Sequence, residues 1–253
     1  MIEARELRKS YGQKEVLKGI SFRVDPGEIF GVLGPNGAGK TTTLRILTGM
    51  IKPGGGDAVV AGFDVAAHPQ EVKRRIGVVP ETGALYEHLT PREFLTFCGD
   101  LFEVEENTLG ARIEKLLQVF NLARSVDEKM TTFSKGMKQK VVIVAALIHD
   151  PEILFFDEVL NGLDVHAALL LKSIIRDLAA RGKTVFFSSH ILEVVERMCD
   201  RVAIMDHGQI VAQGHVADLM RLSKQTTLEG VFRGLTVGTD YEREVKAFVE
   251  ALG

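Results

Sequence analysis

One short stretch of the sequence has the residue types that bind the phosphates of a nucleotide. It fits the pattern G-x-x-x-x-G-K-[S/T], follows the apolar run at residues 29–33 and precedes apolar residues at helical spacing. Glycines let backbone N–H groups point inward at phosphate oxygens, where a Cβ atom would obstruct the approach. The lysine supplies positive charge to the β- and γ-phosphates, the next threonine offers its hydroxyl to Mg²⁺, and the helix N-terminus adds its positive dipole end. We therefore predict a site for ATP and Mg²⁺ at Gly34, Pro35, Asn36, Gly37, Ala38, Gly39, Lys40, Thr41 and Thr42.

A second apolar run, residues 153–156, ends in two consecutive carboxylates, Asp157 and Glu158. At the carboxyl end of a parallel strand, such groups face the same crevice as the phosphate loop. Asp157 is placed to hold Mg²⁺ as the acidic partner of Thr41. Glu158 points differently and is placed to accept a proton from an attacking water. Alone, two acidic residues could simply end a strand, but beside a phosphate loop they predict nucleotide hydrolysis.

The elements that must position these residues follow an α/β pattern. Short apolar runs alternate with helical patterns, which predicts a P-loop core with a mainly parallel sheet at residues 29–33, 77–79, 153–156, 184–187 and 202–205. Residues 17–24 and 57–60 break this rhythm and predict an N-terminal antiparallel β subdomain. Apolar residues at helical spacing between Pro91 and Met130 predict an inserted α-helical subdomain, at about residues 84–136. We expect one domain at residues 1–222, followed by a C-terminal tail at 223–253 with an amphipathic helix at Tyr241–Leu252.

Composition and charge narrow the classes of partner. The hydrophobic content of 45% and the charged content of 26% are those of an ordinary soluble globular protein. The net charge of −3 provides no basic surface for nucleic acid, so we expect no nucleic-acid partner. The longest apolar run, Val141 to Ile148, is far shorter than the roughly 20 residues that cross a bilayer. The N-terminal residues lack the pattern of a signal peptide, so we expect no export.

Further motifs occur in the order of a known family, and over residues 1–220 the chain resembles the nucleotide-binding subunit of ABC transporters. Tyr11 matches the aromatic position that stacks on adenine, and Glu81 stands at the Q-loop position, where Gln is usual. The segment 133–139 resembles the signature motif Leu-Ser-Gly-Gly-Gln, Gly162-Leu163-Asp164 the D-loop, and Ser188-Ser189-His190 the switch histidine. Three segments together, residues 78–81, 134–139 and 227–232, resemble those of the bacterial branch with ABC-2 export-type membrane subunits.

The resemblance implies an ATPase that works as a head-to-tail homodimer. Each ATP would lie between one subunit's phosphate loop and the other's signature residues Ser134, Lys135, Gly136 and Met137. His190 would hold the γ-phosphate and the attacking water, with Lys40 and Glu158, while Asp164 would contribute across the dimer. Glu81 would join Thr41 and Asp157 around Mg²⁺. Lys135 and Met137 replace a Gly and a Gln of the family pattern, which alters the contact between subunits.

The same resemblance implies a separately encoded integral membrane permease, which would hold the protein at the cytoplasmic inner face of the cell membrane. Its coupling helix would enter a groove at Leu85, Tyr86, Leu89 and Phe94. Two other functions remain open from the sequence. One is a soluble ABC ATPase of cofactor assembly, repair or translation, and the other is a regulatory subunit that binds ATP but hydrolyses it poorly.

Overall fold

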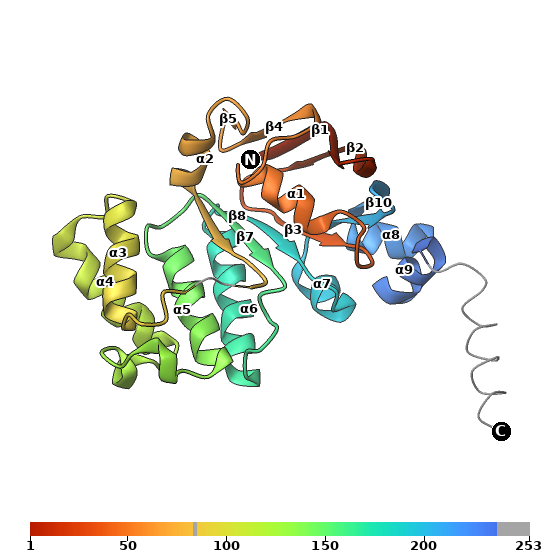
Figure 1. The fold of residues 1–253 in the computed structure, drawn as a ribbon. Helices are drawn as coiled ribbons and strands as arrows, with labels where there is room; N and C mark the ends of the chain where they lie inside the picture. The colour runs from red at the N-terminus through yellow and green to blue at the C-terminus, as the bar shows by residue number, and fades with distance from the viewer. Residues whose placement is uncertain (83–84, 237–253) are drawn as a thin grey trace, which may run out of the picture.

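The computed structural model describes residues 1–82 and 85–236, which form two sheets with helices around them (Figure 1). Within these ranges, one sheet has six strands in the order β10-β9-β3-β8-β7-β6, and the other has four in the order β2-β1-β4-β5. The larger sheet is parallel except for the antiparallel pair β9–β10, and the smaller sheet is antiparallel. The predicted helix at Tyr241–Leu252 lies outside the described residues.

The elements have the following bounds. The strands are β1 (Ile2–Tyr11), β2 (Lys14–Val24), β3 (Ile29–Leu33), β4 (Gly55–Val60), β5 (Phe63–Asp64), β6 (Ile76–Val79), β7 (Ile153–Asp157), β8 (Thr184–Ser188), β9 (Arg201–Asp206) and β10 (Gln209–His215). The α-helices are α1 (Lys40–Leu47), α2 (Pro69–Arg75), α3 (Pro91–Leu101), α4 (Glu106–Val119), α5 (Lys135–Leu147), α6 (Val165–Ala180), α7 (Leu192–Met198), α8 (Val216–Leu222) and α9 (Leu228–Thr236); short 3₁₀ turns lie at Ala123–Ser125 and Met130–Thr132. In the described ranges, no helix has the length and apolar character that a bilayer span requires.

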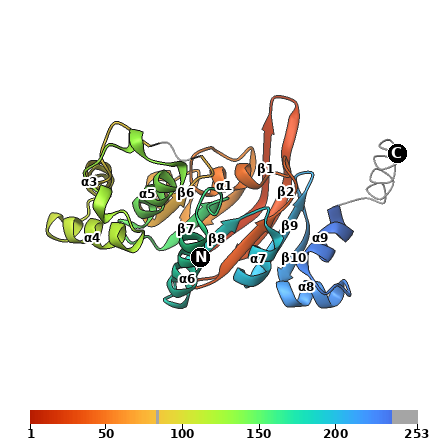
Figure 2. The ribbon, with the colours of Figure 1, turned by 90° about the horizontal axis from the view of Figure 1, so that it is seen from below.

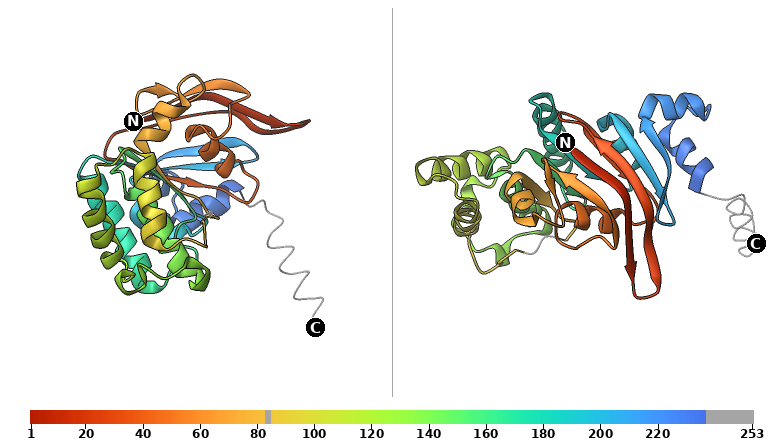
Figure 3. Two further views of the ribbon diagram at one scale, coloured as in Figure 1. Left: turned by 60° about the vertical axis from the view of Figure 1, so that its left-hand side comes forward. Right: turned by 90° about the horizontal axis from the view of Figure 1, so that it is seen from above.

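The central sheet is buried on both faces, which explains its continuous apolar strands. Every residue of β3, β7 and β8 is buried. Phe155 and Phe186 pack toward the antiparallel sheet, where Phe22 lies 6.0 Å from the Phe186 ring centroid. Their neighbours Phe156 and Phe187 pack into the second cluster, formed with α5, α6 and α7. Figure 3 shows the resulting layers, with the antiparallel strands on one side of the central sheet and the green helices on the other.

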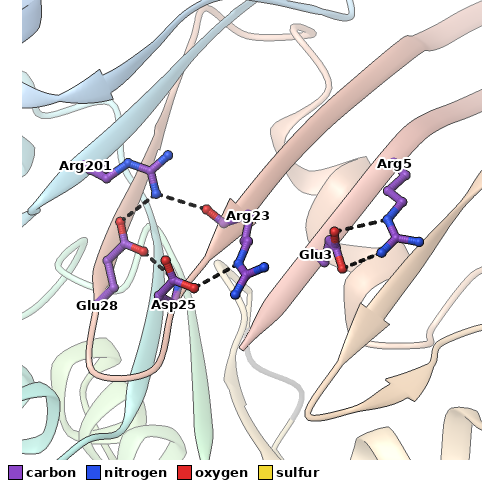
Figure 4. A network of polar contacts seen from close by, with 6 residues as sticks. All are labelled: Glu3, Arg5, Arg23, Asp25, Glu28 and Arg201. Carbon is purple, nitrogen blue, oxygen red and sulfur yellow. Dashed lines mark hydrogen bonds and ion pairs between the residues drawn. The ribbon is translucent and has the colours of Figure 1, made fainter.

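A polar network fixes the start of β3, at the opposite end of this strand from the phosphate loop (Figure 4). Arg201 donates to the Glu28 carboxylate at 3.1 Å and to the Arg23 carbonyl oxygen at 3.2 Å. Glu28 in turn accepts from the backbone N–H of Asp25, and the Asp25 carboxylate accepts from Arg23. The Glu28 side chain is only 10% exposed, so this pair is shielded from solvent more than a surface ion pair. The turn between β2 and β3 is thereby tied to β9.

The predicted fold class is confirmed: a P-loop core, an antiparallel β subdomain and an inserted helical subdomain are all present. The helices α3 and α4 stand at the opposite end of the molecule from α8 and α9 (Figure 2). Strand β10 was not predicted, because alternate residues of this edge strand are exposed and it has no continuous apolar run. In the segment assigned to the tail, α9 places Leu228 and Val231 in the same buried cluster as the helices of the core.

Candidate nucleotide site

The phosphate loop connects the end of β3 to α1, and close contacts require glycine at two of its positions. A Cβ atom at Gly34 would lie 2.4 Å from the carbonyl oxygen of Met205, and one at Gly39 would lie 2.6 Å from Leu17 Cδ2. Gly39 also has a φ of 109°, which L side chains rarely adopt. Within the described chain, no side chain caps α1 at its N-terminus. Its first N–H groups are therefore available to an anion.

The Lys40 side chain lies back along this loop. Its Nζ donates to the carbonyl oxygens of Gly34 at 2.6 Å and Pro35 at 3.2 Å. Burial lowers the pKa of Lys40, and the charges of Glu158, Asp157 and Glu81 oppose this by stabilising the protonated form. The lysine is thus surrounded by acceptors, and a phosphate can replace two carbonyl oxygens as its partner.

The Asp157 carboxylate is held in one orientation at the end of β7. Asp157 and Ser188 are direct partners in the β7–β8 register, and the Ser188 hydroxyl donates to Asp157 Oδ1 at 2.6 Å. Asp157 is 4% exposed and Ser188 is fully buried. One carboxylate oxygen is therefore occupied by the serine, and Asp157 itself lines the cavity described below.

Glu158 leaves the strand with a φ of 51°, an unusual backbone conformation for a side chain of this size. Its N–H donates to the carbonyl oxygen of Ser188 at 3.0 Å, which anchors this turn to β8. Its Oε2 lies 2.7 Å from Nδ1 of His190, within hydrogen-bond distance. The Glu158 side chain is 10% exposed and that of His190 is 60% exposed. Strained residues of this kind gather at functional sites, and here the strain accompanies a carboxylate–imidazole pair.

These residues line one cavity of 450 Å³ at the carboxyl ends of the central strands. The structure brings together the phosphate loop, the Q-loop position, the carboxylate pair and the switch histidine. Of the predicted site residues, those that line the cavity are Gly34, Pro35, Asn36, Lys40, Thr41, Glu81, Asp157, Glu158 and His190. Gly37, Ala38 and Gly39 complete the loop around it, and Thr42 follows in the first turn of α1.

Tyr11 and the signature residues do not line this cavity. Tyr11 ends β1, is 48% exposed and lies under the Lys9 ammonium, 5.7 Å from the ring centroid. Ser134 caps α5 by accepting the N–H of Met137 at 3.2 Å. This helix end, which includes Lys135 and Gly136, lies instead beside Gly162 of the D-loop position. The signature segment is therefore separate from the cavity of its own chain.

Asp164 is engaged within its own chain. One of its carboxylate oxygens caps α6 by accepting the N–H of Ala167, and the other accepts from Lys140 Nζ, each at 2.8 Å. The hydrogen bond from Lys140 is the main cause that lowers the pKa of Asp164, with the capping bond second. Because Lys140 belongs to α5, this ion pair ties the signature helix to the D-loop position.

Sequence reasoning missed five residues of the cavity or its supports, the first of which is Leu33 at the end of β3. Ser188 and Ser189 stood within the quoted motif, but their roles depend on the strand register. Leu192 lines the cavity as the first residue of α7, and Phe232 reaches it from α9. No local pattern could identify Phe232, because its position in the cavity wall depends on the packing of α9.

The parallel sheet, the glycine-rich loop before α1 and the carboxylates at a neighbouring strand end define a P-loop nucleotide hydrolase. Comparison with known families narrows this class. The family described as "ABC transporter" matches residues 17–161, which is more than half of the chain. The chain therefore belongs to the ABC transporter family, as an ATP-binding and ATP-hydrolysing subunit.

Several known proteins are similar over most of the chain. The linearmycin resistance ATP-binding protein LnrL of Bacillus subtilis is 37% identical over 93% of this chain and 76% of its own length. The ABC transporter ATP-binding protein NatA of the same organism is 39% identical over 89% of this chain and 93% of its own length. The Nod factor export ATP-binding protein I of Rhizobium meliloti is 41% identical over 84% of this chain and 64% of its own length.

Solved structures agree with the fold. The ATP-binding subunit of an ABC transporter superposes with a TM-score of 0.89 at 34% identity, over 93% of this chain and 99% of that one. A dimeric ATP-binding cassette bound to ADP and Pi superposes with a TM-score of 0.78 at 23% identity, over 85% of this chain and 99% of that one. At that identity, the second likeness concerns the fold alone.

Proposed function

We propose that two copies of this chain bind two ATP molecules head to tail and drive a separate membrane permease of the export type. One observation carries this proposal: the cavity holds the phosphate loop, both carboxylates and His190, whereas Ser134 and Gly136 lie outside it. The chain thus presents half of a site at the cavity and the other half at the N-terminus of α5. A helix N-terminus with a serine cap is suited to an anion, such as the γ-phosphate of ATP on a second subunit.

Within one chain, each residue of the cavity has a distinct task. The Lys40 ammonium moves from the carbonyl oxygens of the loop to the β- and γ-phosphates. Glu158 accepts a proton from the attacking water, and His190 orients that water and the γ-phosphate through its exposed ring. The 2.7 Å contact between Glu158 Oε2 and His190 Nδ1 fixes the two side chains relative to each other before ATP binds.

The oxygen donors of the cavity fit Mg²⁺. Thr41, Glu81 and Asp157 all line it, and Mg²⁺ is commonly bound by one or two carboxylates together with substrate phosphates. When bound, the ion would neutralise charge on the phosphate oxygens. The hydrogen bond from Ser188 fixes the rotation of the Asp157 carboxylate, and Glu81 adds a second carboxylate where the family pattern has an amide.

The second subunit would supply Ser134, Lys135, Gly136 and Met137 at the γ-phosphate. Lys135 adds a positive charge at this helix N-terminus that the family pattern lacks. Tyr11 is exposed at the tip of the antiparallel sheet and would stack on adenine once ATP is bound. Asp164 would act across the dimer through the position of its loop, since its carboxylate is already held by Lys140 and α6.

A groove beside the helical subdomain is the observation that supports the proposal of a membrane partner. It has a volume of 340 Å³, is mostly apolar and lies between β6, α3 and α5, with Phe94 and Cys98 in its wall. Next to it, Tyr86 is 62% exposed and Phe97 is 43% exposed. Their rings pack edge to face, with the ring centroids 6.0 Å apart. Leu85 and Leu89 pack partly buried against the core. We propose that this surface receives a coupling helix of the permease and holds the protein at the inner face of the membrane.

The export branch is supported by the relative that is named for Nod factor export. The exposed apolar groove favours this function over that of a soluble ABC ATPase. Recovery of the protein in the membrane fraction, when it is expressed with its neighbouring membrane genes, would support the permease partner. Recovery solely in the soluble fraction under those conditions would contradict it.

The dimer is tested with Glu158→Gln, which removes the proton acceptor but keeps the shape of the side chain. We expect this variant to bind ATP, to lose turnover and to sediment as a dimer with ATP but as a monomer with ADP. Lys40→Ala is the matched control and should remain monomeric in both. Turnover of Glu158→Gln at the wild-type rate would remove Glu158 from the proposed role.

A further inference from the structure

Helix α9, the last helix of the described residues, is packed against α7, the helix that directly follows the switch histidine. Leu228 is fully buried and Val231 is 3% exposed, both in the cluster that contains Val195 of α7. The backbone N–H of Leu228 donates to Glu196 Oε2 of α7 at 2.7 Å. The first turn of α9 is thus attached to α7 by an apolar contact and a charge-assisted hydrogen bond.

Phe232 extends this contact to the nucleotide cavity. It lies four residues after Leu228 and therefore on the same side of the helix. It is half-buried against the core cluster and lines the cavity together with His190 and Leu192. Residues more than seventy positions apart in the sequence, Glu158 and Phe232, thus share the wall of one cavity.

The segment that carries His190 has little support of its own. Helix α7 has seven residues, and its N-cap residue, Ile191, makes no side-chain capping bond. A helix this short is not stable without tertiary contacts. The His190 side chain is 60% exposed and has its hydrogen bond to Glu158, while the apolar surface next to it comes from α7 and α9. The position of the histidine therefore depends on what packs against α7.

We infer that Phe232 is a positioning residue for ATP hydrolysis, which acts through α7 to hold His190 against Glu158 and the γ-phosphate. This inference rests on the proposed function and adds to it a dependence of turnover on α9. Glu196 serves the same purpose, because its carboxylate holds the first turn of α9 on α7. ATP binding depends on the phosphate loop rather than on α7 and α9, so the effect falls on turnover rather than on affinity.

The test compares Phe232→Ala with Leu219→Ala in the full chain. Leu219 lies on α8, packs partly buried against the same cluster and does not line the cavity, so it controls for lost packing. We expect Phe232→Ala to lower kcat about tenfold with KM for ATP changed less than about twofold, the split expected for misplaced catalytic groups. Leu219→Ala should lower Tm by a similar amount and keep its kcat near that of the wild type.

Two conservative variants separate positioning from general stability. Phe232→Leu retains an apolar wall and should recover most of the kcat. Glu196→Gln keeps an acceptor for the Leu228 N–H and should be near wild type, whereas Glu196→Ala should lose kcat as Phe232→Ala does. Equal kcat values for Phe232→Ala and Leu219→Ala would overturn the inference. If these two kcat values were equal while Glu158→Gln lost turnover, the proposed function would remain supported and only the positioning role of Phe232 would be refuted.

Discussion

The hydrogen bond from Ser188 to Asp157 predicts a specific loss of stability in Ser188→Ala. The bond is 2.6 Å long, the donor is fully buried and the acceptor is 4% exposed, so water cannot easily replace the lost hydroxyl. Hydrogen bonds to charged groups contribute about 1.5–3 kcal/mol, and a buried acceptor left without its donor adds its desolvation penalty. We expect the free energy of unfolding to fall by about 2–3 kcal/mol, and Tm by about 5–10 °C for a chain of this size.

Ser189→Ala is the matched control at the next residue. Ser189 is 2% exposed, and its hydroxyl oxygen accepts a neutral hydrogen bond from the N–H of Ile191 at 3.1 Å. Its loss should cost about 1 kcal/mol. Urea denaturation followed by circular dichroism, without nucleotide, measures both. If Ser188→Ala were no less stable than Ser189→Ala, the charge-assisted bond would not fix the orientation of the Asp157 carboxylate.

Two further predictions concern charge. Lys40→Ala should weaken ATP binding far more than AMP binding, because only ATP has the β- and γ-phosphates that Lys40 contacts. Isothermal titration calorimetry measures both affinities. Equal losses of affinity would contradict the assignment of Lys40 to these phosphates. Burial lowers the pKa of His149 below its ordinary 6.5. The folded state therefore favours the neutral imidazole, and the stability of the protein falls as the pH drops from about 6.5 toward the lowered pKa. His149→Gln, which cannot titrate, should therefore show a shallower fall of Tm between about pH 7 and pH 5 than the wild type; identical slopes would contradict this.

The parts of the site that could be predicted from the sequence are those that are local in the chain. The phosphate loop and the pair Asp157–Glu158 are each contiguous, and the strands before them are apolar on both faces. A P-loop fold brings these segments to one edge of the sheet whatever the details of packing. This is why the cavity contains the predicted loop, carboxylates and histidine together.

The remaining features depend on tertiary contacts that no local pattern records. The bond from Ser188 to Asp157 requires the register of β7 against β8. Lys140 meets Asp164 only because α5 and the D-loop segment lie side by side. Phe232 reaches the cavity through the packing of α9 on α7. The positive φ of Glu158 was equally hidden, since glycine is the residue that normally signals such a turn.

The central claim is that the ATP site is completed by a second copy of the chain, and mixing two inactive variants tests it most directly. Lys40→Ala damages the cavity half of the site, and Ser134→Asp keeps a good N-cap while it sets a negative charge against the γ-phosphate. Each variant alone should be inactive. In a heterodimer of the two, both lesions fall in one site and the other site is intact.

An equal mixture of Lys40→Ala and Ser134→Asp should therefore recover about half of wild-type turnover, because neither variant dimerises with itself and each mixed dimer has one of two sites intact; fully random pairing would still give about a quarter. Ser134→Asp mixed with the double variant, which offers no intact pairing, should remain inactive. Turnover in the first mixture that equals the average of the two variants measured separately would contradict a site shared between subunits.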